Sequence, residues 1–85
     1  MDFTRGRIVC SKAGRDKGLY FAVLAEQDGR VLVANGSQHK LAKPKAKNPA
    51  HLAMTAKVLP PALMENDKLL TQAIAEQLSA MPQTT

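Results

Sequence analysis

The stretch GRIVCSKAGRDKGLYFAVL, residues 6–24, predicts two β-strands joined by a short basic loop. Branched and aromatic residues form an apolar run on each side, while glycines and charges lie between the runs. The loop carries Lys12, Arg15 and Lys17 against a single acid, Asp16. We expect this loop to be where the protein meets its ligand.

Apolar residues fall on both faces of the two predicted strands, residues 6–11 and 19–26. Side chains alternate between the faces of a strand, so this pattern predicts burial on both sides. A small closed barrel gives its strands that environment. In the first strand Ile8 and Cys10 share one face and Val9 the other; in the second, Leu19, Phe21 and Val23 share one face and Tyr20, Ala22 and Leu24 the other.

Two further glycine turns extend the predicted sheet into a meander. Asp28-Gly29 lies between apolar runs and favours a type I′ hairpin, which needs φ > 0 at both central residues. A third strand, residues 31–34, follows this turn. Asn35-Gly36 repeats the same turn chemistry and predicts a fourth short strand near residues 39–42.

The segment KPKAKNP, residues 43–49, is expected to be an extended, charged connection rather than a central strand. Proline fixes φ and cannot donate a hydrogen bond to a sheet. Residues 51–55 predict a short fifth strand that returns to the barrel. The fold class that follows is mostly β, a small antiparallel barrel of about five short strands.

From residue 66 the pattern becomes helical. Asn66 or Asp67 can cap the first turn, and Pro82 ends the helix. The chain is expected to divide into a barrel, residues 1–58, and a proline-led linker with a C-terminal amphipathic helix, residues 59–85. The helix must pack on the barrel, on a second copy or on a partner. Its mostly apolar stripe comprises Leu70, Ala73, Ile74, Gln77, Leu78 and Met81.

Charge is unevenly distributed along the 85 residues, whose net charge is +5. Residues 1–58 hold eleven Lys or Arg against four Asp or Glu, a balance of +7. Residues 59–85 hold one Lys against three acids, a balance of −2. A concentrated basic segment attracts polyanions, and nucleic acid is the leading candidate. The alternative is a basic but inert solvated surface.

The composition argues against several other classes of protein. One cysteine, Cys10, excludes an internal disulfide framework, and neither a secretion signal nor a membrane span is visible, so we expect a cytoplasmic protein. Cys10, His39 and His51 lack the spacing of a zinc site. Residues 14–18 lack the spacing of a P-loop. We therefore expect no cofactor, no metal, no small-molecule substrate and no enzymatic activity.

The same residues resemble a known family. GRIVCSKAGRDKGLYFAVL, followed by the Asp-Gly turn, VLVANG and KLAKPKAKNPAHL, is similar to KOW-motif proteins. It looks most like the small bacterial relatives of KOW-containing archaeal and eukaryotic large-subunit ribosomal proteins. The resemblance covers residues 3–55; GRDKG is its most specific part, and Gly18 looks like the characteristic glycine of the family. It implies an SH3-like barrel that binds RNA, commonly ribosomal RNA, without catalysis.

The candidate RNA contacts lie mainly in two basic stretches. Cations of the first loop can bind phosphates, and arginine can also stack on a base; the alternative is a solvated hairpin loop that Asp16 orders. Lysines at alternate positions of residues 43–47 could project toward one side; the alternative is a solubilising connector. The predicted RNA-binding residues are Arg5, Arg7, Lys12, Arg15, Lys17, His39, Lys40, Lys43, Lys45 and Lys47, and the predicted turn residues are Gly14, Gly18, Asp28, Gly29, Asn35 and Gly36.

Two functions from different classes follow. The first is a non-catalytic RNA-binding module that contacts structured RNA of the translation apparatus, with ribosomal RNA as its expected partner. The second is a protein-interaction module that docks on the translation or transcription machinery, ribosomal proteins included, through the barrel and the C-terminal helix. A third, DNA binding, lacks the pattern of a recognition helix.

Overall fold

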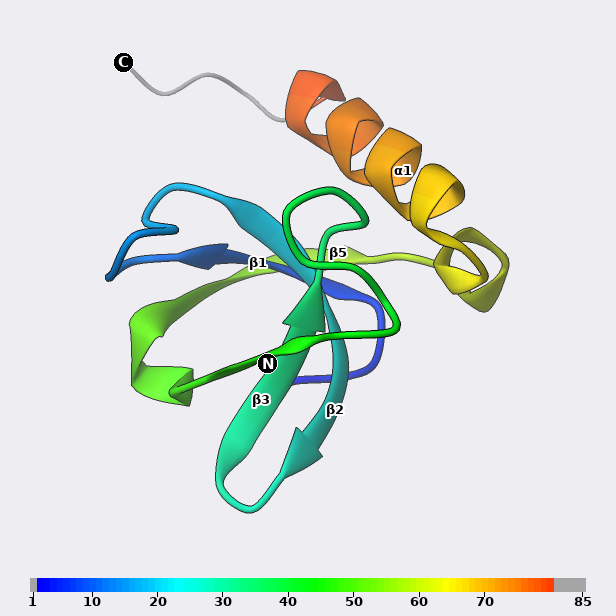
Figure 1. Ribbon diagram of the computed structural model, residues 1–85. Helices are drawn as coiled ribbons and strands as arrows, with labels where there is room; N and C mark the ends of the chain where they lie inside the picture. Colours follow the sequence, from blue (N-terminus) through cyan, green and yellow to red (C-terminus); the bar gives the residue numbers. More distant parts are fainter. Residues whose placement is uncertain (1, 81–85) are drawn as a thin grey trace.

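The computed structural model describes residues 2–80, which form one antiparallel sheet and a C-terminal helix (Figure 1). Across the sheet the strand order is β4-β3-β2-β1-β5. The prediction of a mostly β fold, with about five short antiparallel strands in a small barrel-like sheet and one C-terminal helix, is therefore confirmed. The elements are β1 (Arg7–Ser11), β2 (Tyr20–Gln27), β3 (Arg30–Ala34), β4 (Lys45–Lys47), β5 (Leu52–Val58), α1 (Asp67–Ala80) and two 3₁₀ turns, η1 (Pro49–His51) and η2 (Pro61–Met64).

The sheet buries apolar side chains on both of its faces, as the alternation predicts. The inner cluster joins β1, β2, β3 and β5, so the sheet curls around it. The outer cluster joins the opposite faces of β1, β2 and β3 to α1 and the segment before it. The inner cluster comprises Val9, Phe21, Val23, Val31, Val33 and Leu52, and the outer cluster Ile8, Ala22, Ala34, Leu59, Met64, Leu70, Ala73 and Ile74.

Helix α1 packs on the barrel and begins at the predicted cap. The Asn66 side chain accepts a hydrogen bond from Leu69 N (2.8 Å), which satisfies a free donor of the first turn. Leu70, Ala73 and Ile74 of the stripe are buried. Leu78 keeps 38% of its surface exposed. The barrel and the helical segment therefore share the outer cluster, while Met81 and Pro82 lie outside the described residues.

The two glycine turns differ from each other. Asp28 (φ 52°) and Gly29 (φ 75°) both lie in the left-handed region, so the type I′ hairpin is confirmed. Asn35 does not repeat this conformation. Its side-chain Oδ1 instead accepts from Ser37 N (3.1 Å) and His39 N (3.0 Å), which opens a wider loop.

The prediction of a fourth strand near residues 39–42 is wrong, because these residues belong to that loop. The fourth strand is β4, within the segment that we expected to be a connection. Within residues 2–80 it pairs with β3 alone, through Val31, Leu32 and Val33, and so lies at the edge of the sheet. Pro44 lies just before β4, where a missing N–H does not interrupt the pairing. The fifth strand is also longer than predicted, reaching Val58.

Candidate nucleic-acid interface

The basic loop between β1 and β2 turns on two glycines in left-handed conformations, Gly14 (φ 83°) and Gly18 (φ 90°). Only glycine adopts these angles without steric cost. Lys17 N donates to Gly14 O (3.2 Å), and Gly18 N donates to Ser11 O (2.9 Å). Gly18 thus returns the chain to the end of β1 so that β2 can pair with it, which is the turn role predicted for this residue.

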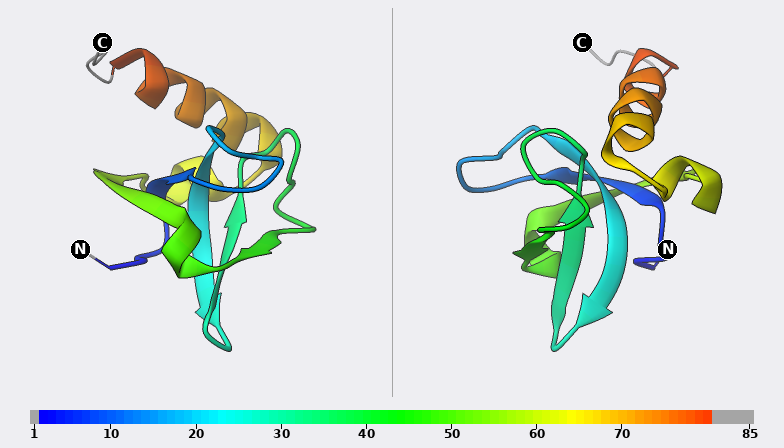
Figure 2. Two further views of the ribbon diagram at one scale, coloured as in Figure 1. Left: turned by 90° about the vertical axis from the view of Figure 1, so that its left-hand side faces the viewer. Right: turned by 45° about the vertical axis from the view of Figure 1, so that its right-hand side comes forward.

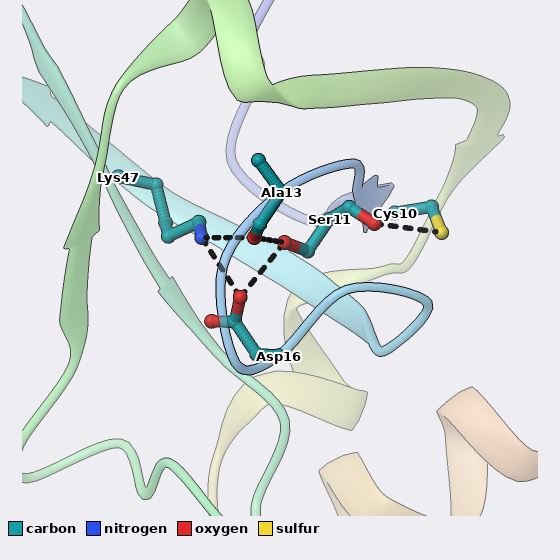
Figure 3. A network of polar contacts seen from close by, with 5 residues as sticks. All are labelled: Cys10, Ser11, Ala13, Asp16 and Lys47. Carbon is teal, nitrogen blue, oxygen red and sulfur yellow. Dashed lines mark hydrogen bonds and ion pairs between the residues drawn. The ribbon is translucent and has the colours of Figure 1, made fainter.

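Asp16, the acid of this loop, points into the protein and forms a buried ion pair (Figure 3). Its Oδ1 lies 2.9 Å from Lys47 Nζ and accepts a hydrogen bond from Ser11 Oγ (2.8 Å). Asp16 is 6% exposed and Lys47 7%. Lys47 belongs to β4 and Ser11 to β1, which are not neighbours in the sheet. The ion pair therefore ties the loop across the open side of the barrel.

The pKa of Asp16 lies below its ordinary value. Burial of the carboxyl raises the pKa, but several interactions oppose it and prevail: the hydrogen bonds from Lys47 and Ser11, and the charges of Lys47 and Lys45. The side chain is therefore a carboxylate at neutral pH. Its second oxygen, Oδ2, is buried and has no hydrogen-bond partner among residues 2–80, so Lys47 and Ser11 at Oδ1 supply the side-chain contacts that hold the charge.

The inward position of Asp16 leaves the outside of the loop purely cationic. Lys12, Arg15 and Lys17 are all exposed. Because the negative charge of the loop is already paired with Lys47, the exposed cations meet no acid of their own loop. A rigid loop with three outward cations can bind a polyanion without first ordering its backbone.

The second basic stretch is a loop between β3 and β4, held from several sides. Asn35 N and Gly36 N both donate to His39 O (2.8 and 3.1 Å), and the His39 ring lies 5.7 Å from the Phe21 ring. Leu41 N donates to the Asp67 carboxylate of α1 (2.8 Å). Helix α1 thus supports the loop that carries further cations. Lys40, Lys43 and Lys45 are exposed, whereas His39 is half-buried.

The expectation that Lys47 shares the exposed basic surface is wrong. Alternate positions of a strand do point to the same side, but Lys47 lies under the β1–β2 loop and its ammonium is paired with Asp16. Its role in this structure is to hold the loop. The sequence offered a weak signal for this pairing, a single acid among cations, but nothing that identified the partner 31 residues away.

Arg5 and Arg7 lie apart from the two loops and hold the N-terminal segment. Arg7 donates to Asp2 O (2.6 Å) and Thr55 O (2.9 Å), and Arg5 donates to Leu24 O (3.2 Å). Arg7 begins β1, whereas the basic loop follows the end of β1 at Ser11. The predicted site residues therefore divide into a group at the loops and a pair of backbone-anchoring arginines.

The two basic loops lie at the same end of the molecule, away from the hairpin that joins β2 and β3 (Figure 2). A hollow of about 160 Å³ lies between the start of β2, at Leu19 and Tyr20, the second loop, at Ser37 and Gln38, and α1; the cations of the two loops do not line it. Tyr20 is half-buried and packs on the outer cluster.

Comparisons with known proteins do not indicate a family or a function for the chain. The chain matches no protein-family model and no curated protein sequence. Within residues 2–80, no three His, Cys, Asp or Glu side chains lie close enough together to hold a metal ion. No helix in that range is both long and apolar enough to cross a lipid bilayer. The arrangement of cations is therefore the main guide to function.

Proposed function

We propose that the protein is a non-catalytic RNA-binding module. The observation that carries the proposal is the β1–β2 loop, whose acid is buried against Lys47 while Lys12, Arg15 and Lys17 face outward. The resemblance of the same loop to the KOW motif supports RNA, and ribosomal RNA in particular, as the polyanion that binds. The part of the chain that carries this loop also holds the positive balance of +7.

The mechanism we infer is phosphate contact by a pre-formed surface. The loop is closed by two glycine turns and a buried ion pair, so little conformational entropy is lost when RNA binds. Lys40, Lys43 and Lys45 extend the positive surface at the same end of the molecule. Because cations on a rigid frame contact the backbone more than base edges, the shape of the RNA should dominate selectivity.

The rival proposal, a protein-interaction module whose contact is carried by α1, has less support. The apolar residues of the helix that a partner would need, Leu70, Ala73 and Ile74, are covered by the barrel. The surface that remains on the helix is mainly polar, with Leu78 partly exposed. The described residues therefore favour a partner protein less than they favour RNA.

A nuclease experiment separates the two proposals. The tagged protein is expressed in a bacterial host, and the lysate is sedimented through a gradient before and after treatment with ribonuclease. RNA binding predicts that the protein moves from heavy fractions to light ones after treatment. A sedimentation profile that ribonuclease leaves unchanged in heavy fractions would favour the protein-interaction module.

A further inference from the structure

A second hollow, of about 410 Å³, lies in the loop between β3 and β4. Its volume falls within the range of about 300–1,000 Å³ that is usual for small-ligand sites. Lys40 and Lys43, which line it, belong to the positive surface proposed above, but that proposal gives the hollow itself no role. The residues that line the hollow are Gln38, His39, Lys40, Ala42 and Lys43.

Hydrogen bonds and an aromatic contact hold part of the loop that forms this hollow. His39 N donates to the Asn35 side chain (3.0 Å) and its carbonyl accepts from Asn35 N (2.8 Å). The imidazole is held against Phe21 of the inner cluster. Leu41 N is bonded to Asp67 of α1. A site held in this way does not have to be ordered by its ligand.

The lining combines two kinds of chemistry. Its surface is mainly apolar, and His39 and Ala42 are among the residues that line it. Lys40 and Lys43 add two exposed cations, and a turn hydrogen bond from Lys43 N to Lys40 O (3.0 Å) holds them together. A ligand that suits this lining has a flat apolar ring and an attached anion. A nucleotide has both.

We propose that the hollow binds one unpaired nucleotide of the RNA, with its base in the hollow and its phosphate at Lys40 and Lys43. The inference rests on the proposed RNA-binding function and adds a preference to it: RNA with a loop or bulge over a continuous duplex. Bases in loops leave the stack and pack on aromatic side chains such as histidine, whereas paired bases cannot reach a hollow.

The test compares two RNAs and two variants of the full chain. One RNA is a hairpin with an unpaired loop, and the other is a blunt duplex with the same stem sequence. Ala42→Leu fills the hollow without changing charge, and Ala62→Leu, at an exposed position in η2, is the matched control. The wild type and Ala62→Leu should prefer the hairpin by about tenfold, as expected from one stacked base. Ala42→Leu should bind both RNAs equally.

The outcomes separate this inference from the proposed function. Equal binding of the two RNAs by the wild type, or an unchanged preference in Ala42→Leu, overturns the nucleotide site and leaves RNA binding in place. Failure of the wild type to bind either RNA refutes both.

A titration of the protein, followed by the NMR signals of its backbone amides, tests the nucleotide site a second time. Uridine 5′-monophosphate should shift the resonances of residues 38–43, and inorganic phosphate should not reproduce those shifts. Identical shifts from the two probes would show an anion site without a base pocket, which contradicts the proposal.

Discussion

Asp16 differs from the other charged residues of its loop because it is buried and paired. A carboxylate whose pKa is lowered by folding contributes stability above its unfolded-state pKa, here an ordinary value of 3.8. That contribution is lost as the pH falls from this value through the lower pKa of the folded state. The sign follows from the direction of the shift: the unfolded chain takes up the proton first.

We therefore expect Asp16→Asn to be less stable than the wild type at pH 7, by about 3 kcal/mol, because Lys47 then keeps a buried charge without its partner. Urea unfolding from pH 7 to pH 3 measures the difference. The two proteins should become more similar in stability below about pH 4, where Asp16 is protonated in the unfolded chain. A difference that stays constant over the whole range would contradict the ion pair.

Gly36 is the glycine on which the docking of α1 depends. It has a φ of +81°, and a Cβ at this position would overlap the backbone of Asp67 and the side chain of Thr71. Gly29 has a similar φ of +75° but opens to empty space. The two positions therefore share the backbone strain and differ in packing.

The comparison predicts that Gly29→Ala costs about 1–2 kcal/mol, the strain of a left-handed alanine. Gly36→Ala should cost a further 1–3 kcal/mol or so, because the helix must shift to make room. Urea unfolding followed by circular dichroism measures both. Equal losses would show that the contact between the helix and the loop does not contribute to stability.

Among the elements, the β1–β2 loop and β4 act together through the Asp16–Lys47 pair. If the pair positions the loop, Asp16→Asn and Lys47→Met should each weaken RNA binding. The variant carrying both has the charge of the wild type, yet it should bind about as weakly as either single variant, a non-additive result. Fluorescence anisotropy with a hairpin RNA, under conditions where circular dichroism shows every variant folded, measures the three affinities.

A purely electrostatic role gives a different pattern. Removal of the acid would strengthen binding, removal of the lysine would weaken it, and the combined variant would match the wild type. Tighter binding by Asp16→Asn would therefore contradict the positioning role of the pair.

The elements also show what the sequence can and cannot predict. The faces of β1 and β2, the Asp28-Gly29 hairpin and the Asn66 cap follow from local rules of alternation and turn chemistry, and all three are confirmed. The position of β4 does not follow from such local rules, because the Asn35 side chain organises the loop that precedes this strand. The burial of Lys47 depends on a partner far away in the chain, which no local pattern reveals.

At the scale of the whole molecule, the two basic loops define one end and the β2–β3 hairpin the other. Exposed cations at other places, such as Arg30 beside the hairpin and Lys57 near the end of β5, provide a built-in control. They add to the net charge without belonging to either loop. A comparison of the loop with these positions distinguishes a specific surface from general basicity.

The most direct measurement is the salt dependence of RNA affinity for the wild type, Arg15→Glu/Lys17→Glu and the charge-matched control Arg30→Glu/Lys57→Glu, with far-UV circular dichroism to confirm folding. The loop variant should lose at least about tenfold in affinity, and its plot of log affinity against log salt should be shallower by about 1.4, or roughly 0.7 for each lost phosphate contact to a single strand. The control should keep the wild-type slope. Equal losses in the two variants, or a loop variant that binds RNA as the wild type does, would contradict RNA recognition by the β1–β2 loop.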